Sequence, residues 1–284
     1  MRILVTGGCG FIGSNLVRYL ANKDCEVLVV DDLSTGCREN LEGTSAKIFL
    51  QDVREPMYAR NLEKIDAVVH LAAVADLIKA SENPKRTWKI NVNGTLNMLE
   101  FCRENRVKKL VLASSSAVEG NSLYGATKSA SEALCNSYNY TFEGFNNVCL
   151  RFSNVYGKYS HNDSVIPNFL KAAKEGKPLV VYGDGEQTRD YVHVLDICQA
   201  IYKSLTAGSG VYEIGTEKEV SINQLIRMIE IMIGKELNVE YKPARPIDIR
   251  NSVASINKAK YVLNYSPEIS LEKGLGMLWQ DVNS

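Results

Sequence analysis

The sequence predicts an α/β protein built on a doubly wound parallel sheet, with a smaller second α/β lobe. Three observations support this fold class. Short β-branched runs alternate with helical stretches over the first two-thirds of the chain, as in repeated βαβ units. These runs lack polar alternation, as expected for strands that helices cover on both faces. A glycine-rich turn links the first predicted strand directly to the first predicted helix.

The elements follow one another in a regular order. The apolar runs predict strands at residues 3–5, 26–30, 46–50, 67–71, 109–113 and 147–151. Helical periodicity predicts helices between some of them, at residues 12–22, 87–105 and 124–142. Because connecting segments of this length cross over the sheet, the strands are expected to be parallel.

The pattern changes after residue 154, where Gly, Pro, Asn and Asp become frequent and the elements shorter. We therefore expect residues 1–153 to form a Rossmann-type domain and residues 154–284 a smaller, interleaved lobe. Segments near 190–215 are expected to return to the first domain, with a strand at 211–214 joining its sheet. Asp196 is interpreted as the N-cap of a helix over 197–205.

Composition excludes several classes of protein. The 284 residues carry 33 Lys plus Arg against 33 Asp plus Glu, so neither a nucleic acid nor a membrane is an expected partner. No apolar run is long enough to span a bilayer, and no cleavable leader is recognisable. The seven cysteines are scattered without a Cys-x-x-Cys pair, which predicts reduced thiols in a cytoplasmic protein. His70, His161 and His193 lack metal-ligand spacing and are interpreted as structural or exposed, so no metal is expected.

The clearest ligand-binding motif is the run TGGCGFIG. Its Gly7, Gly10 and Gly13 follow the first strand and open a helix. Glycines permit the tight turn and let the backbone approach a pyrophosphate, which the amides at the helix N-terminus can bind. A tight turn alone would need no ligand. Here strand, loop and helix stand in the order of a dinucleotide site.

An acidic residue ends the next predicted strand. Asp31 follows Val30, where a carboxylate accepts hydrogen bonds from both hydroxyls of an adenosine ribose. The same carboxylate would repel a 2′-phosphate, which favours NAD over NADP. Neighbouring Asp32 is interpreted mainly as a turn residue. Asp52 fits the adenine edge or, almost equally well, a plain loop.

Tyr124 and Lys128 are four residues apart in a predicted helix and therefore share one face. A phenol with a pKa of about 10 is a poor base, but a nearby ammonium and an oxidised nicotinamide both favour the phenolate. Such a pair is also common on surfaces. Serines at residues 114–116, at the carboxyl end of a parallel strand, favour the catalytic interpretation, because a hydroxyl there can bridge a substrate oxygen and the phenol.

Together these residues resemble the extended short-chain dehydrogenase/reductase family and, within it, the nucleotide-sugar 4-epimerases. The resemblance covers nearly the whole chain, through TGGCGFIGSN, VVDDLSTG, HLAAVAD, NVNGTLNML, SSSAV, YGATK, RFSNVYG and GDGEQTRDYVHVLD. It implies an NAD-dependent epimerase that interconverts UDP-hexoses at C4 through a transient 4-keto sugar. The substrates would be UDP-glucose and UDP-galactose, or their N-acetyl forms.

The resemblance also implies site residues. Ser115, Tyr124 and Lys128 match the catalytic hydroxyl, the acid/base and the lysine that lowers the pKa of the phenol. Cofactor contacts are implied for Gly7, Gly10, Phe11, Ile12, Gly13, Asp31, Asp32, Ser34, Thr35, Gly36, Asp52, Val53, Leu71, Ala72, Ala73, Ala75, Asn91, Tyr124 and Lys128. Substrate contacts are implied for Ser115, Ser116, Tyr124, Asn154, Val165, Arg189, Arg245, Asp248 and Ser252.

Three positions depart from the family pattern. The segment from Ser115 to Tyr124 is shorter than the usual loop that helps cover the sugar, so a more open site, or one covered by another chain, is expected. Glu119 replaces the usual aromatic, and Ile247 replaces a usual glycine.

Two further positions narrow the chemistry that the resemblance implies. Ser116 and Ala117 stand where sugar 4,6-dehydratases carry an Asp-Glu pair, so the machinery for eliminating water is missing. The small Ser252 would leave room for a 2-acetamido group.

Two other functions stay open. A nucleotide-sugar 4-ketoreductase or dehydrogenase would consume or produce NADH, and a catalytically quiet NAD-binding regulator would not depend on Tyr124. The resemblance also implies a homodimer through helices at 87–105 and 124–142. Trp88, Val92, Leu96 and Leu99 have the helical spacing for that contact, which would serve equally well against the chain's own sheet.

Overall fold

The computed structural model describes residues 1–56, 64–160, 164–244 and 250–283. At its centre is a seven-stranded parallel sheet in the order β11-β6-β5-β4-β1-β2-β3. The strands are β1 (Arg2–Thr6), β2 (Glu26–Asp31), β3 (Lys47–Leu50), β4 (Ala67–His70), β5 (Leu110–Ser115), β6 (Val148–Phe152) and β11 (Gly210–Ile214). The strand order reverses between β1 and β4, and ligands of such sheets bind at the carboxyl ends beside that point.

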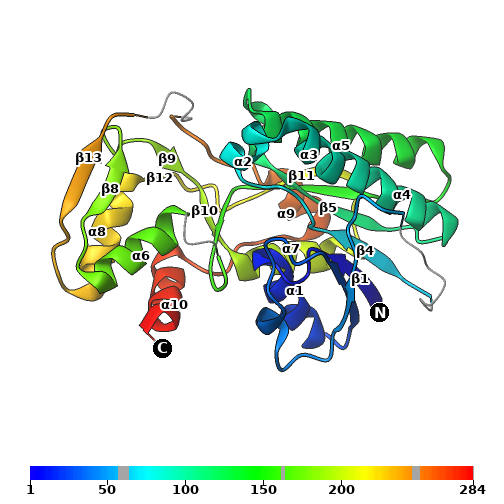
Figure 1. Ribbon diagram of the computed structural model, residues 1–284, viewed down its shortest axis with the longest axis horizontal. Helices are drawn as coiled ribbons and strands as arrows, with labels where there is room; N and C mark the ends of the chain where they lie inside the picture. The colour runs from blue at the N-terminus through cyan, green and yellow to red at the C-terminus, as the bar shows by residue number, and fades with distance from the viewer. Residues whose placement is uncertain (57–63, 161–163, 245–249, 284) are drawn as a thin grey trace.

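Helices cover both faces of the sheet (Figure 1). One face packs against α1 (Phe11–Ala21), α7 (Val194–Ser204) and α9 (Asn257–Leu263). The other packs against α4 (Gly94–Glu104) and α5 (Leu123–Thr141). Shorter helices lie in the connections: η1 (Arg38–Leu41), α2 (Leu77–Glu82), α3 (Pro84–Trp88), η2 (Lys89–Asn93) and η3 (Ser116–Glu119). The predicted doubly wound α/β fold is therefore confirmed.

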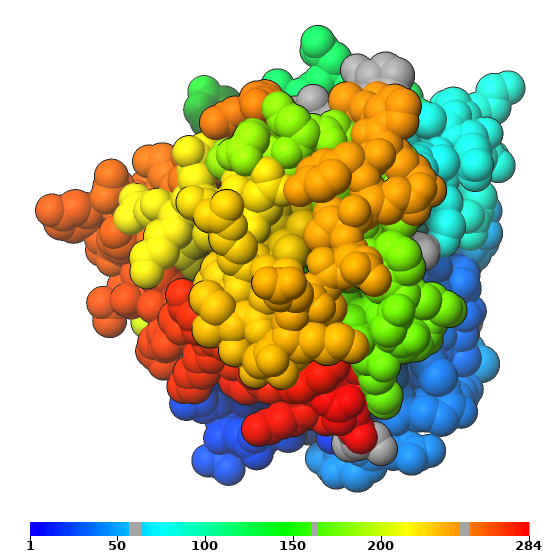
Figure 2. Space-filling model, turned by 90° about the vertical axis from the view of Figure 1, so that its left-hand side faces the viewer, coloured from blue at the N-terminus to red at the C-terminus, as the bar shows by residue number. Residues whose placement is uncertain are grey.

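A second lobe lies beyond the carboxyl edge of the sheet and has its own apolar core. Its helices are α6 (Val165–Glu175), α8 (Ile222–Ile233) and α10 (Leu271–Asn283). Its strands form pairs: β7 (Asn154–Tyr156) with β10 (Tyr191–His193), β9 (Thr188–Arg189) with β12 (Val220–Ser221), and β8 (Leu179–Tyr182) with β13 (Val239–Lys242). Figure 2 shows the outer face of this lobe, where the yellow to orange segments that include α8 and β13 lie above the red α10.

The chain crosses between the two lobes more than once. After the second lobe begins with β7, α7 and β11 return to the sheet, and β11 pairs with β6 at its edge. The 211–214 segment therefore lies in the large sheet. The division of the chain at residue 153 stays a prediction.

The helix expected at 87–105 is present as one uninterrupted helical run, but it is not a regular α-helix throughout. α3 ends at Trp88, five residues form the wide π-helical turn η2, and α4 begins at Gly94. The carbonyl of Asn91 accepts hydrogen bonds from the hydroxyls of Thr95 (2.6 Å) and Ser131 (3.0 Å). Side-chain hydroxyls that bond to helix carbonyls in this way compete with the regular backbone pattern.

The interpretation of Asp196 as an N-cap is also wrong. α7 begins at Val194, and Nδ1 of His193 caps it by accepting a hydrogen bond from the Leu195 amide (3.3 Å). Asp196 instead lies in the first turn, where its carboxylate accepts hydrogen bonds from the amides of Glu268 (2.9 Å) and Ile269 (3.2 Å). The acid thus holds the segment before α10 against α7.

Candidate active site

The glycine loop between β1 and α1 leaves no room for side chains. Gly7 has φ +69°, and a Cβ there would lie 2.8 Å from the Ala72 amide nitrogen. A Cβ on Gly13 would lie 2.1 Å from the Gly7 carbonyl oxygen. Gly10 is the N-cap of α1 and has no side chain to bond to the first-turn amides. The loop is therefore a backbone cradle at a helix N-terminus, beside Phe11 and Ile12, which suits a pyrophosphate.

Asp31 joins this cradle to the loop after β2. Its carboxylate is buried and accepts hydrogen bonds from the amides of Cys9 (2.9 Å) and Leu33 (2.8 Å). A Cβ on Gly36 would lie 2.9 Å from the carbonyl carbon and from the Cβ of Cys9, so the loop after β2 can pass this close to the cradle only with a glycine there. Asp31 is thus fixed at the carboxyl end of β2, where the predicted ribose contact requires it.

The other acids near this loop bond locally. Asp32 accepts hydrogen bonds from the amide and hydroxyl of Ser34 (2.9 and 2.6 Å), which fits its interpretation as a turn residue. Thr35 is exposed beside them. Asp52 bonds to the Arg54 amide (2.8 Å) and guanidinium, which holds the pKa of this carboxyl below its usual range. These bonds favour the plain-loop interpretation of Asp52.

The loop after β4 lies against the glycine cradle. The amide of Ala72 bonds to Thr6 Oγ1 (3.3 Å), and the same oxygen lies 2.7 Å from Nδ1 of His70. Burial lowers the pKa of His70 to about 3, so this ring is neutral, and its Nε2 has no hydrogen-bond partner. Of the residues that follow, Leu71 and Ala73 are partly buried and Ala75 is exposed. The prediction that His70 is structural fits its burial, whereas His161 lies outside the described residues.

Ser115, Tyr124 and Lys128 come together at the carboxyl end of β5. Ser115 ends the strand, and its hydrogen bond with Tyr124 favours the phenolate, although burial dominates and raises the pKa of Tyr124 to about 12. Lys128 donates a hydrogen bond to the Ala113 carbonyl (2.8 Å), and its Nζ lies 5.8 Å from the centre of the Tyr124 ring. Burial lowers the pKa of Lys128 to about 8. A phenol, a hydroxyl and an ammonium are therefore adjacent, as acid/base chemistry on a bound alcohol requires.

Asn91 lies below this group and not on its surface. Its Nδ2 donates hydrogen bonds to the Val74 carbonyl (3.1 Å) and to Thr127 Oγ1 (2.9 Å), and its Oδ1 accepts one from the Val74 amide (2.8 Å). Both donors are thus used within the protein, and the cofactor contact of Asn91 stays a prediction. Val53 is likewise buried, and its carbonyl accepts a hydrogen bond from Asn97 (2.8 Å).

One buried charged group behind the site was missed in the sequence. Glu132, one turn after Lys128 on α5, bonds to both Nε and Nη2 of Arg151 (2.9 Å each) and accepts a hydrogen bond from Ser114 Oγ (2.5 Å). The group joins α5, β5 and β6 directly behind Ser115. The sequence contained one indication of this group. Glu132 lies at helical spacing from Tyr124 and Lys128 and therefore on the same face of the predicted helix.

The predicted substrate residues lie mostly in the second lobe. Asn154 begins β7, Val165 begins α6, and Arg189 ends β9, where its Nη1 donates to the Thr188 carbonyl (2.7 Å). Ser116 begins η3 on the site side, and Ser252 lies in an irregular segment and is partly buried. Arg245 and Asp248 lie outside the described residues, as does Ile247.

The shortened segment after Ser115 is an ordered connection. It consists of η3 and a turn that leads to Ser122, whose side chain caps α5 by accepting a hydrogen bond from the Gly125 amide (3.0 Å). Glu119, at the end of η3, is exposed, and its carboxylate lies 3.8 Å from the Arg151 guanidinium.

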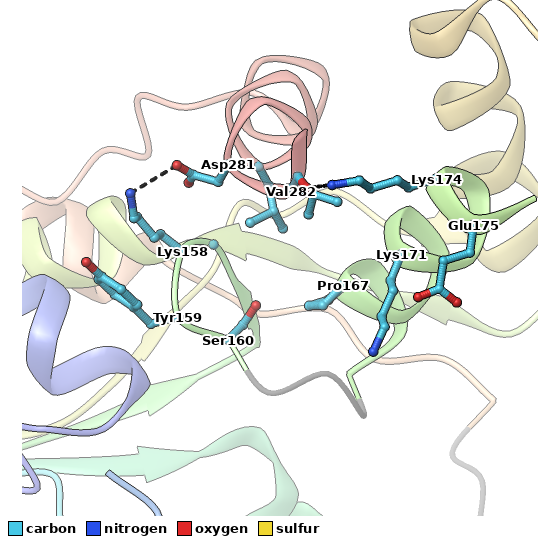
Figure 3. A pocket seen from close by; sticks show the side chains of 11 residues that line it. Lys158, Tyr159, Ser160, Pro167, Lys171, Lys174, Glu175, Asp281 and Val282 are labelled. Carbon is cyan, nitrogen blue, oxygen red and sulfur yellow. Dashed lines mark hydrogen bonds and ion pairs between the residues drawn. The ribbon is translucent and has the colours of Figure 1, made fainter. Parts of the chain in front are cut away.

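A separate cavity of about 650 Å³ lies between α6, α10 and the loop at residues 157–160 (Figure 3). Lys158, Lys171 and Lys174 line it, and Lys158 forms an ion pair with Asp281 (3.1 Å). None of the predicted site residues lines this cavity, so it is distinct from the group around Tyr124.

Comparison with known proteins identifies the family. The model of the NAD dependent epimerase/dehydratase family matches residues 3–215. The chain belongs to this family. NAD is the cofactor of the family, as the glycine cradle and Asp31 implied.

Related proteins act on several UDP-sugars. The chain is 34% identical to the UDP-glucuronate 4-epimerase of Thermodesulfobacterium geofontis, over 96% of this chain and 93% of that protein. It is 32% identical to UDP-glucuronic acid decarboxylase 1 of Arabidopsis thaliana, over 99% of this chain and 69% of that protein.

Two solved structures share the whole fold. The UDP-glucose 4-epimerase of Thermotoga maritima, with UDP-glucose, has a TM-score of 0.94 and 33% identity and covers 99% of this chain and 98% of its own. The UDP-N-acetylglucosamine 4-epimerase of Methanobrevibacter ruminantium, with UDP-N-acetylmuramic acid, has a TM-score of 0.94 and 32% identity, covering 98% and 97%.

Among the described residues, no group of three or more His, Cys, Asp or Glu side chains is arranged to hold a metal ion. No helix in that part of the chain is long and apolar enough to span a membrane.

Proposed function

We propose that this protein is an NAD-dependent 4-epimerase of UDP-hexoses. The observation that carries the proposal is the contact of Ser115, Tyr124 and Lys128 at the carboxyl end of β5. The glycine cradle after β1 lies at the same edge of the same sheet. A proton-transfer group and a dinucleotide site side by side suit the reversible oxidation of a secondary alcohol.

The residues present fit NAD. Gly7 and Gly13 lie where any Cβ would fill the cradle, and the α1 N-terminus offers amides to a pyrophosphate. Asp31 would bind the adenosine ribose, and Lys128 the ribose of the nicotinamide. Bound NAD supplies a hydride acceptor and, in the reverse direction, a hydride donor.

The protein's own groups move the proton. Tyr124 takes the proton of the sugar 4-hydroxyl, with Ser115 in the hydrogen-bond path between them. An ammonium on Lys128, with its Nζ 5.8 Å from the centre of the Tyr124 ring, would favour the phenolate against the burial that raises the pKa of Tyr124. The 4-keto sugar then turns in the site, so that a hydride returned from the cofactor would reach the other face of C4. Tyr124 gives its proton back to the 4-oxygen, which yields the opposite epimer.

The substrates that we propose are UDP-glucose and UDP-galactose, together with their N-acetyl forms. Relatives are named as epimerases of a neutral, an N-acetylated or an acidic UDP-sugar, so membership of the family does not determine which sugar is the substrate. The small Ser252 supports tolerance of a 2-acetamido group. The UDP group would be bound by Asn154 and Arg189.

A second candidate, decarboxylation of UDP-glucuronate, is favoured by the relationship to UDP-glucuronic acid decarboxylases such as the Arabidopsis enzyme. Oxidation at C4 of a uronate places a ketone β to the carboxylate, which then loses carbon dioxide. The same oxidation step would thus begin either reaction, and the products distinguish them.

The test is conversion by purified protein without added NAD, with UDP-galactose, UDP-N-acetylgalactosamine and UDP-glucuronate each followed by proton NMR. We expect the gluco epimers of the first two, and loss of conversion by about a thousandfold in Tyr124→Phe. Tyr138→Phe, on the same helix but bonded to Glu100, is the matched control and should retain activity.

Other products would identify other functions. A UDP-pentose from UDP-glucuronate would indicate the decarboxylase, and stoichiometric change in NADH absorbance a ketoreductase or dehydrogenase. NAD binding without any Tyr124-dependent conversion would indicate a quiet regulator and overturn the proposal.

A further inference from the structure

Asp190 is the residue at which the predicted substrate-binding segments meet. It links β9, which ends at Arg189, to β10, which begins at Tyr191. Its side chain is almost wholly buried, with 1% exposed, in a chain where most acids lie on the surface. Buried carboxylates in folded proteins are held by specific donors, so the partners of Asp190 reveal what it does.

The carboxylate accepts hydrogen bonds from two other segments. Thr216, after β11, donates from its amide (2.9 and 3.0 Å) and from its hydroxyl (2.6 Å), and the amide of Glu217 follows (3.1 Å). The amide of Ala254 donates from the segment that carries Ser252 (3.2 Å). The donors are therefore backbone amides and one hydroxyl.

The backbone of Asp190 binds a third segment. Its carbonyl accepts a hydrogen bond from the amide of Asn154 (3.0 Å), in register with the pairing of β7 and β10. Asp190 thus contacts Asn154 through its main chain and directly follows Arg189 in the chain. Its side chain bonds to the segment that carries Ser252. Three residues to which we assign binding of the UDP-sugar are therefore close to Asp190 in the chain or through hydrogen bonds. Asn154 bonds to it, Arg189 precedes it, and Ser252 lies two residues before Ala254, which bonds to it.

We propose that Asp190 is a positioning residue that sets the mutual placement of the Asn154, Arg189 and Ser252 segments for binding the nucleoside diphosphate of the substrate. The inference rests on the proposed function, because it assumes that these segments bind UDP. Asp190 itself has no predicted contact with the substrate, so its role in binding would be indirect.

The packing around Asp190 shows that the arrangement tolerates little change. A Cβ on Gly215 would lie 2.4 Å from Asp190 Oδ2 and 2.7 Å from Ser153 Oγ, so only a glycine lets β11 end this close. Replacing the carboxylate by an amide would turn one acceptor into a donor that faces backbone N–H groups. A buried donor left without a partner destabilises the local arrangement.

The experiment measures UDP binding by calorimetry to the full-length protein with its NAD, for wild type and Asp190→Asn. We expect UDP affinity to fall about tenfold or more in Asp190→Asn, while the NAD content stays unchanged. Asp196→Asn is the matched control, because Asp196 is also a buried acid that accepts backbone amides, but it lies on α7 and not among these segments. Both variants are expected to lower the melting temperature, and only Asp190→Asn to weaken UDP binding.

Two milder substitutions at Thr216 keep the inference testable if Asp190→Asn does not fold. Thr216→Val removes only the 2.6 Å hydroxyl bond and should weaken UDP binding several-fold, whereas Thr216→Ser keeps that bond and should bind as wild type. Unchanged UDP affinity in both Asp190→Asn and Thr216→Val, or equal loss in Asp196→Asn, would overturn this inference alone. Failure of the wild type to bind UDP would overturn the proposed function and this inference with it.

Discussion

Lys128 is buried, which disfavours its charged form, and we expect this to make the activity of the site sensitive to pH. Burial lowers its pKa to about 8, while the carboxylate of Glu132, one turn along α5, raises it. The buried His70, Cys135 and Cys149 are its other titratable neighbours. Because the phenolate of Tyr124 needs the ammonium form of Lys128, the lysine must stay protonated for catalysis.

We therefore expect kcat/KM for the UDP-sugar to rise by about tenfold per pH unit below pH 8, because the phenolate fraction of Tyr124 grows, and to level off above about pH 8, where loss of the Lys128 ammonium offsets further ionisation of the phenol. In Glu132→Gln the stabilising carboxylate is absent, the pKa of Lys128 falls further, and the profile levels off at lower pH. The measurement is a pH profile of kcat/KM for both proteins. Glu100→Gln, which alters an ion pair on the surface of α4, should leave the profile in place. Coincident profiles for wild type and Glu132→Gln would refute this account.

At the scale of elements, the helices α4 and α5 present the surface on which a dimer is predicted. Of the four apolar residues proposed for that contact, Val92 and Leu99 are buried within the chain, whereas Trp88 is 46% and Leu96 38% exposed. The exposures are compatible with both of the alternatives that the spacing left open, and the dimer contact stays a prediction. Two residues pack against the chain's own core, and two remain for a partner.

We expect the protein to be a homodimer and Leu96→Glu to convert it to a monomer, because a carboxylate buried at an apolar interface would be left without a partner. Light scattering after gel filtration measures the mass directly. Ile231→Glu is the control, since Ile231 is 82% exposed on α8 in the other lobe and should not affect assembly. A monomeric wild type, or a dimeric Leu96→Glu, would show that the helices do not form the interface.

The elements also show what the sequence could and could not predict. The six strands and the helices α1 and α5 lie within about two residues of the predicted ranges. Five of the six strands are largely buried, which their apolar runs reflect, whereas β3 is mostly exposed at the edge of the sheet. The cap of α7 is local, but it falls on His193, which is not a usual capping residue. The π-helical turn at η2 instead involves a side chain brought from elsewhere, because Ser131 bonds to the Asn91 carbonyl. Asp190 and Glu132 escaped prediction for the same reason, since their partners are distant in the chain and no local pattern marks them.

At the scale of the whole molecule, the two lobes are joined by buried polar groups as well as by crossing chain segments. Asp190 links β11 to the second lobe, and His193 lies where β10 meets α7, with its ring 5.3 Å from that of Tyr156. Burial lowers the pKa of His193 to about 4 and that of His70 to about 3. Both histidines are therefore neutral in the folded protein at every pH where it is expected to work.

This burial predicts loss of stability in mild acid. An unfolded histidine has a pKa near 6.5, so below that pH the unfolded chain binds protons that the folded chain excludes until about pH 4 or 3. Stability is thus complete above pH 6.5 and is lost as the pH falls, by about 2 kcal/mol per histidine between pH 7 and 5. Urea unfolding at the two pH values measures the difference. His193→Asn keeps a side-chain acceptor for the α7 N-terminus and should lose about 2 kcal/mol less than wild type over this range. If His193→Asn and wild type lose the same free energy, the histidine at the junction of the lobes does not control the acid stability.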